Sequence, residues 1–196
     1  MTSYKNHINR LLNISLIKKI FENLRNNFVI LYYHGVISDE ESKNLKGPNK
    51  HLFVSKTNFI DQMNFLKENG IEVISLDELY KQNFKPKKFS VIITFDDGYK
   101  DNLKIVYPIL KNYEFPFIIY LIPKILSEMP WVWWLELWSQ LENKNEIFFE
   151  NKKTDIHNEK LKTNFFLQLK KKMKLLKIEE QKIELTKIFN IQKISD

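Results

Sequence analysis

The sequence predicts an α/β protein in which parallel strands alternate with helices. Val91–Thr94 is a run of β-branched residues without polar alternation, which is typical of a strand buried on both faces of a sheet. This run leads into Asp96-Asp97-Gly98, and parallel α/β folds hold their chemistry at the carboxyl ends of strands. Segments with helical spacing separate it from other short apolar runs, as expected of right-handed β/α units.

Length and composition fit a globular chain. Its 196 residues are 43% hydrophobic and 14% aromatic, which indicates a folded core. The net charge of +7 favours anionic partners, but lysine is spread along the chain, which argues against a nucleic-acid site. The absence of cysteine excludes disulfides and thiolate metal sites. No secretory leader or apolar run of about 18 residues occurs, so we expect no transmembrane span and a cytoplasmic location, with peripheral membrane attachment as the alternative.

The first segment, residues 1–27, predicts a basic amphipathic helix. Leu12, Leu16, Ile20 and Leu24 are spaced by four residues and would form one apolar stripe. Such a stripe either packs over the domain or lies on a membrane surface, and packing is the commoner outcome.

The predicted core begins with a strand over Phe28–Tyr33, a continuous apolar run that ends at His34-Gly35. The next segment, Ser38–His51, is polar and contains Gly47-Pro48, which predicts a loop. Further elements follow in the order helix, strand, short helix, central strand and strand. They are predicted at Ser55–Gly70, Ile71–Ile74, Ser75–Tyr80, Val91–Thr94 and Phe117–Ile122.

The segment Trp131–Trp138 contains four tryptophans in eight residues. Indole rings pack on sugar faces, so the segment is a candidate carbohydrate-binding surface. Trp134 and Trp138 are four residues apart on one face of a predicted helix, which describes a core stripe equally well. A core stripe is the commoner arrangement.

From Leu141 onward the chain is more polar. Asn143–Asn158 predicts a loop or a short hairpin, and Glu159–Ile194 has a long, lysine-rich helical pattern with one apolar face. Lys170–Lys172 and Lys174 form a basic patch on that pattern. The patch is either a solvated helix face or a contact for a phosphate-rich membrane surface.

The adjacent acids Asp96 and Asp97 are the candidate site. Consecutive strand residues point to opposite sides, so we expect two different roles, such as a metal ligand and a proton carrier, unless Gly98 turns the chain sharply. The structural alternative is that Asp97 caps the following helix. His34 ends the first strand and would lie level with the acids if the two strands are neighbours, where it would orient a substrate or make a structural hydrogen bond.

Several stretches of the core match one known family. They are Ile30–Val36, Phe59–Leu66, Gly70–Leu79, Thr94–Tyr99, Pro108–Lys111 and Phe115–Leu121. Thr94–Tyr99, with the sequence Thr-Phe-Asp-Asp-Gly-Tyr, resembles the signature of the polysaccharide deacetylases, the fourth carbohydrate esterase family. The resemblance covers about residues 28–138. It implies the N-terminal half of an irregular (β/α) barrel of the polysaccharide deacetylase type, followed by a helical insertion or tail.

The resemblance also implies a reaction, the metal-dependent hydrolysis of N-acetyl groups on a cell-surface polysaccharide or exopolysaccharide. Asp96 would be the general base that takes a proton from the attacking water, and Asp97 would be a carboxylate ligand of a divalent metal, zinc in many members. A bound metal brings the pKa of water toward about 7. His34 and Tyr99 would contact the polysaccharide or oligosaccharide substrate.

The family completes its metal site with a His-x-x-x-His motif, and this chain lacks it. Its histidines are His7, His34, His51 and His157, and no two have that spacing. A catalytic zinc needs three protein ligands, so the ligand set is incomplete. Three interpretations stay open: a fragment, a chain completed by a separately encoded C-terminal half, or a non-catalytic module that binds glycan or a partner protein. We predict an N-terminal helix at 1–27, a deacetylase-like core at 28–138 and a lysine-rich helical insertion or tail at 139–196.

Overall fold

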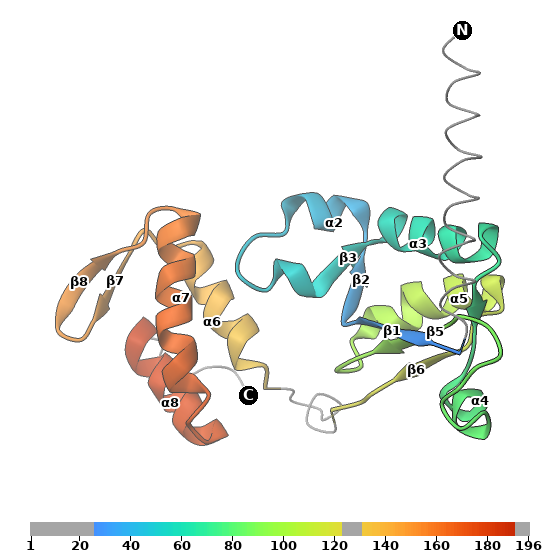
Figure 1. The fold of residues 1–196 in the computed structure, drawn as a ribbon. Coiled ribbons are helices and arrows are strands. Elements are labelled where there is room, and N and C mark those ends of the chain that lie inside the picture. The colour runs from blue at the N-terminus through green and yellow to red at the C-terminus, as the bar shows by residue number, and fades with distance from the viewer. Residues whose placement is uncertain (1–25, 123–130, 191–196) are drawn as a thin grey trace, which may run out of the picture. The chain divides into compact units, whose positions relative to one another are not determined.

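A computed structural model describes residues 26–122 and 131–190, which form parts of two compact units (Figure 1). The first unit comprises Met1–Lys43 and Leu52–Leu121, and the second comprises Asn44–His51 and Ile122–Asp196. The predicted N-terminal helix lies outside the described residues, apart from residues 26 and 27. The units divide after Leu121, whereas the sequence-based division places the core boundary at residue 138.

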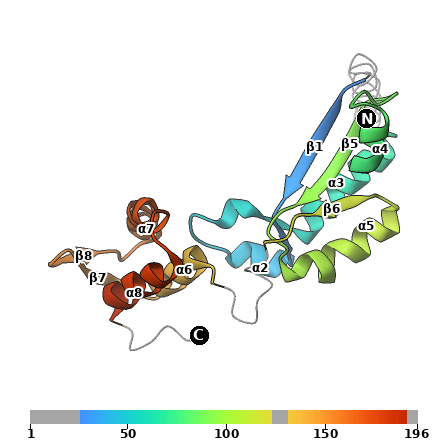
Figure 2. The same ribbon diagram turned by 90° about the horizontal axis from the view of Figure 1, so that it is seen from below.

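A parallel sheet forms the centre of the first unit. Its middle strand, β5 (Ser90–Phe95), is buried along its whole length, as predicted for this segment. β1 (Phe28–Tyr33) pairs with one side of β5. On the other side of β5, its first residues pair with β4 (Glu72–Val73) and its last residues pair with β6 (Phe117–Ile119). Figure 2 shows β1, β5 and β6 side by side.

Helices cover both faces of this sheet because the side chains of β5 alternate. Val91, Ile93 and Phe95 pack with α3 (Lys56–Glu68) and α5 (Tyr107–Tyr113), whereas Ile92 packs with α4 (Leu76–Lys81) on the other face. The predicted starts of α3 and α4 are confirmed. Ser55 caps α3, and Ser75 forms a capping box with Glu78 at the start of α4.

The prediction of a loop over Ser38–His51 is wrong for part of its length. A short helix, α2, spans Asp39–Asn44, and a 3-10 turn, η1, spans Lys50–Leu52. Ser38 and Glu41 exchange hydrogen bonds at the start of α2: the Ser38 N–H donates to Glu41 Oε2 at 2.9 Å, and the Glu41 N–H donates to Ser38 Oγ at 3.2 Å. This reciprocal capping stabilises a helical turn in a polar segment. Two short strands, β2 (Gly35–Ile37) and β3 (Phe53–Ser55), flank it and pair in parallel.

The second unit has its own hydrophobic core. It contains α6 (Trp133–Glu142), the hairpin strands β7 (Glu146–Phe149) and β8 (Lys152–Asp155), and the helices α7 (Glu159–Met173) and α8 (Ile178–Phe189). The long helical pattern predicted over Glu159–Ile194 is therefore two helices. The break falls where Lys177 has an extended backbone and precedes a new capping arrangement with Glu180.

The tryptophan segment belongs to the core of this second unit. Trp133 is buried and stacks on Phe166 of α7, with ring centroids 6.4 Å apart. Trp134 and Trp138 are partly buried against the same cluster, and Trp131 donates a hydrogen bond from Nε1 to Gln181 Oε1 at 2.9 Å. The core interpretation of the tryptophans therefore describes this segment better than an open sugar-stacking surface.

The predicted α/β class is confirmed, while closure into a barrel remains a prediction. Among the residues described, no helix combines the length and apolar character that crossing a membrane requires.

Candidate functional site at the carboxyl ends of the strands

The carboxyl ends of β1, β5 and β6 lie at one edge of the sheet. Tyr33 is in register with Phe95, and Phe95 is in register with Ile119. The ladder continues one residue further, since the Asp96 N–H donates to the Tyr33 carbonyl at 2.8 Å and the Tyr120 N–H donates to the Phe95 carbonyl at 2.7 Å. β1 and β5 are thus neighbours, and His34 follows β1 at the level where Asp96 follows β5.

The chain turns sharply at the acidic pair itself. Asp97 has φ +72° and Gly98 has φ +78°, so two successive residues lie in the left-handed region. Glycine adopts this conformation readily, whereas Asp97 is held in it by the turn. The strand alternation that predicted two different roles therefore ends at Asp96, and the separate roles of Asp96 and Asp97 remain a prediction. Both residues are half-buried.

The following helical segment does not begin with Asp97 as its cap. A π-helix, η2, spans Asn102–Val106 and runs directly into α5. The residue at its cap position is Asp101, which makes no side-chain capping bond. π-helical turns are rare and occur frequently at functional sites.

Asp101 and Asn102 tie the segment after β1 to the acidic turn. Asp101 Oδ2 accepts a hydrogen bond from the Val36 N–H at 2.6 Å. Asn102 Nδ2 donates to the His34 carbonyl at 3.0 Å and to Asp101 Oδ2 at 3.3 Å. Asn102 is only 1% exposed. These two side chains fix the backbone of His34 and Val36 relative to the helix that follows Asp96 and Asp97.

Sequence reasoning missed the roles of Asp101 and Asn102. One local signal was available. Asp101 and Asn102 are polar residues that closely follow Thr94–Tyr99, in a segment where one side of the next helix must face the core. Asn102 occupies such an inward position. Its partners are His34 and Asp101, and the His34 carbonyl lies 68 residues earlier in the chain, so no local pattern identifies it.

Aromatic contacts complete the surroundings of the predicted substrate-binding residues. The ring of Tyr99 meets Phe53 edge to face at 5.7 Å. The ring of His34 meets Tyr32 in the same way at 6.4 Å. A Cβ added to Gly35 would lie 2.6 Å from Phe53 Cδ1, so a glycine is required where β2 passes this ring. Contacts of His34 and Tyr99 with substrate remain predictions.

We expect Asp101→Ala to destabilise the first unit by about 1–3 kcal/mol, because the Val36 N–H loses its acceptor in a half-buried place. Asp101→Asn, which keeps an acceptor oxygen, should have a smaller effect. Unfolding in urea followed by far-UV circular dichroism measures both. Equal destabilisation by the two variants would contradict this account.

The Asp101 carboxyl group also makes the stability of the first unit depend on pH. Burial raises the pKa of Asp101, and the hydrogen bond from Val36 opposes that rise. A raised pKa in the folded state means that the group's contribution to stability is present below its ordinary pKa and is lost as the pH rises through the raised value. The Asp101→Asn variant should lack this part of the pH dependence.

The residues present do not form a complete metal site. Within residues 26–122 and 131–190, no cluster of three or more histidine, aspartate or glutamate side chains could hold a metal ion. Asp97 would supply one carboxylate, and a catalytic zinc needs three protein ligands with an open position. The described part of the chain therefore does not fit a zinc centre on its own.

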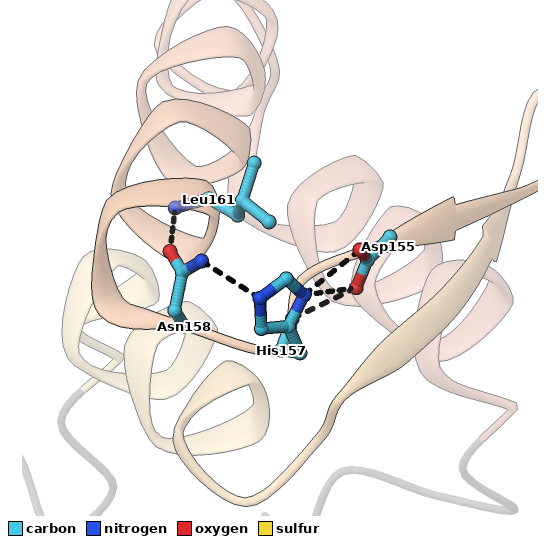
Figure 3. A network of polar contacts seen from close by, with 4 residues as sticks. All are labelled: Asp155, His157, Asn158 and Leu161. Carbon is cyan, nitrogen blue, oxygen red and sulfur yellow. Dashed lines mark hydrogen bonds and ion pairs between the residues drawn. The ribbon is translucent and has the colours of Figure 1, made fainter.

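An Asp–His pair in the second unit has a structural explanation (Figure 3). The His157 N–H donates to Asp155 Oδ1 at 3.0 Å, and His157 Nδ1 lies 2.8 Å from Asp155 Oδ2. These bonds lower the pKa of Asp155. The neighbouring Asn158 caps α7 by accepting a hydrogen bond from the Leu161 N–H. Both members of the pair are mostly exposed, and they shape the turn that starts α7.

Comparison with known proteins agrees with the motif at the strand end. Residues 83–172 match the sequence model of the family Polysaccharide deacetylase. YxkH of Bacillus subtilis (strain 168), whose name places it with the polysaccharide deacetylases, is 36% identical over 101 residues, which are 50% of this chain and 33% of that protein. The poly-β-1,6-N-acetyl-D-glucosamine N-deacetylase of Staphylococcus aureus (strain MSSA476) is 33% identical over 115 residues, which are 58% of this chain and 35% of that protein.

Two solved structures also resemble the chain. A de-N-acetylase from Aggregatibacter actinomycetemcomitans has 27% identity and a TM-score of 0.41, over 66% of this chain and 45% of that one. The deacetylase PplD of Streptococcus pyogenes, in complex with acetate, has 28% identity and a TM-score of 0.42, over 56% of this chain and 50% of that one.

The fold and the acidic turn define an α/β protein with a polar site at the carboxyl ends of its parallel strands. The sequence matches show that part of the chain is similar to polysaccharide deacetylases, which confirms the resemblance found in its motifs. The chain spans about a third of the length of the curated relatives it matches.

Proposed function

We propose that this chain carries the acidic half of an active site that hydrolyses N-acetyl groups on a polysaccharide. The observation that carries the proposal is the sharp turn at Asp97 and Gly98, which places two half-buried acids, Asp96 and Asp97, directly after the central strand. The match to an N-deacetylase of poly-β-1,6-N-acetyl-D-glucosamine supports a polymer of N-acetylhexosamine as the substrate class. That this polymer is a cell-surface polysaccharide or exopolysaccharide is part of the proposal.

In the proposed reaction, water adds to the acetamide carbonyl carbon and the carbon–nitrogen bond breaks, which yields acetate and a free amine. Asp96 is the general base that takes a proton from the attacking water, a role worth roughly 10²–10⁴ in rate. Asp97 offers one carboxylate toward a divalent metal, with zinc as the family's usual choice. His34 and Tyr99 flank the acids and contact the sugar.

The remaining metal ligands would come from outside the described residues. A separately encoded C-terminal half is the partner that would supply them under this proposal. The incomplete ligand cluster favours a second candidate function, a module that binds glycan or a partner protein without hydrolysis. The two candidates differ in what Asp97 and a metal do for glycan affinity and for acetate release.

The test uses the purified chain, alone and together with the separately encoded C-terminal half, with β-1,6-linked N-acetylglucosamine oligomers and added zinc. Acetate release and calorimetric binding of glycan and of zinc would be measured for the wild type, Asp96→Asn and Asp97→Ala. Asp77→Asn, an exposed acid at the start of α4, is the matched control.

In the presence of the C-terminal half that supplies the remaining ligands, the active-site proposal predicts zinc binding that is lost in Asp97→Ala. It also predicts acetate release that falls by roughly 10²-fold or more in Asp96→Asn and stays unchanged in Asp77→Asn. Glycan affinity that survives both chelation and Asp97→Ala, without acetate release, would instead establish the binding module.

A further inference from the structure

The two faces of the central sheet are covered to different extents. α3 and α5 pack against the face that carries Tyr33, Phe95 and Ile119. α4 packs against the opposite face, where Phe28 and Ile92 lie in the amino halves of β1 and β5. α4 therefore covers the amino half of this opposite face.

The carboxyl half of the same face carries two exposed tyrosines. Successive strand residues point to opposite faces, so Tyr32, which precedes Tyr33, points to the side of α4. Tyr120 follows Ile119 and continues the ladder of β6, which places it on the same side. Tyr32 is 71% exposed and Tyr120 is 49% exposed. We call the surface formed by Tyr32 and Tyr120 the tyrosine face.

The tyrosine face borders the proposed general base, Asp96. Tyr32 is in register with Thr94, and Asp96 follows Thr94 by two residues and so lies on the same face. Tyr120 follows β6 at the level where Asp96 follows β5. From the spacing of parallel strands and their rise per residue, the Asp96 backbone lies roughly 8 Å from that of Tyr32 and roughly 5 Å from that of Tyr120.

Two side-chain contacts connect the tyrosine face to the acidic turn. The ring of Tyr32 meets the ring of His34 edge to face at 6.4 Å. Leu121, which follows Tyr120, reaches the turn itself, since a Cβ added to Gly98 would lie 2.6 Å from Leu121 Cδ2. β1 and β6 pair with opposite sides of β5, so the two tyrosines flank the acidic strand end (Figure 2).

We propose that Tyr32 and Tyr120 bind the polysaccharide on both sides of the N-acetylhexosamine unit whose acetamide meets Asp96. The choice of ligand rests on the proposed function, which brings such a unit to Asp96. A sugar in that position lies over the neighbouring side chains of the same face. Aromatic rings pack on the faces of sugar rings, and the tyrosine hydroxyl can remain in contact with water. Contacts to flanking units orient the reacting unit, which is how remote binding energy assists a reaction.

The spacing of the two tyrosines also predicts a dependence on ligand length. Their backbones are separated by two strand spacings and by two residues along the strands, which is roughly 12 Å. This span is longer than a single hexose ring. A β-1,6-linked N-acetylglucosamine tetramer can therefore contact both tyrosines at once, whereas the monosaccharide contacts one of them at most.

Calorimetric titration of the full chain with this tetramer tests the proposal. Tyr32→Ala and Tyr120→Ala should each weaken tetramer binding by roughly tenfold, and Tyr32→Phe and Tyr120→Phe, which keep the ring, by about threefold or less. The matched controls are Tyr80→Ala and Tyr107→Ala, which should leave the affinity unchanged. Tyr80 and Tyr107 are 70% and 44% exposed and lie on α4 and α5.

A protection experiment on the wild type makes the test independent of any effect of the substitutions on folding. Tetranitromethane nitrates exposed tyrosines, and mass spectrometry of peptides locates them. Tetramer at about ten times its Kd should slow nitration of Tyr32 and Tyr120 roughly tenfold, because only that fraction of the sites stays free. Nitration of Tyr80 and Tyr107 should not change.

The outcomes separate this proposal from the proposed function. Tetramer binding that depends on both tyrosines, without acetate release, would support the tyrosine face and refute hydrolysis. Acetate release that falls in Asp96→Asn but is unchanged in Tyr32→Ala and Tyr120→Ala, with no protection from nitration, would overturn the tyrosine face and leave the proposed function standing. Protection that rises with protein concentration in the absence of glycan would show that a second copy covers the face, and would also overturn the proposal.

Discussion

Gly47→Ala is expected to destabilise the second unit by about 2–5 kcal/mol. Gly47 has φ +91°, where a residue with a Cβ is strained. A Cβ at this position would lie 2.3 Å from Trp138 Cε2 and 2.6 Å from Trp138 Cζ2. These atoms belong to a rigid indole ring that packs against the core of the unit, so the overlap cannot be relieved by rotating a flexible chain end.

Tryptophan fluorescence during urea unfolding measures this effect selectively, because all four tryptophans lie within residues 131–138. Gly70→Ala is the control for backbone strain alone. Gly70 has φ +62°, and an added Cβ would meet nothing within 4 Å. We expect about 1 kcal/mol for this variant, measured by circular dichroism. A similar effect of the two substitutions would show that the Trp138 contact contributes nothing.

The second large effect is expected from Leu169→Ala, which should destabilise the second unit by about 2–5 kcal/mol. Leu169 is completely buried on α7, in the cluster that also contains Trp133 and Phe166. Truncation removes apolar contacts and leaves a cavity in a core built from elements on both sides of the β7–β8 hairpin.

The chain contains a matched control for this substitution on the same helix. Leu167 is 46% exposed, so Leu167→Ala removes the same atoms at a neighbouring position without leaving a closed cavity. We expect a loss of about 1 kcal/mol or less. Unfolding of both variants in urea is measured by tryptophan fluorescence. Comparable losses of stability in the two variants would contradict the assignment of this cluster as the core of the unit.

Much of the first unit was predictable from local patterns. The buried run of β5, the caps Ser55 and Ser75, and the acidic strand end all depend on residues close together in the sequence. Local patterns also misled in one place. The polar composition of Ser38–His51 predicted a loop, but the exchange of hydrogen bonds between Ser38 and Glu41 stabilises α2.

The second unit was less predictable. Its helical periodicity was visible, but a repeat of apolar residues does not reveal where one helix ends and turns back. The four tryptophans had two consistent interpretations, sugar stacking and core packing. Contact of Trp133 with Phe166, 33 positions later, distinguishes them in favour of the core.

The sequence by itself determined the α/β class, the similarity to polysaccharide deacetylases and the position of the acidic pair Asp96 and Asp97. Only the tertiary structure decided that His34 lies beside these acids and that Asp101 and Asn102 hold its segment in place. The physical reason is distance along the chain. Helix spacing, capping and strand burial act over a few residues, whereas the bond from Val36 to Asp101 joins residues 65 positions apart and forms only when β1 pairs with β5.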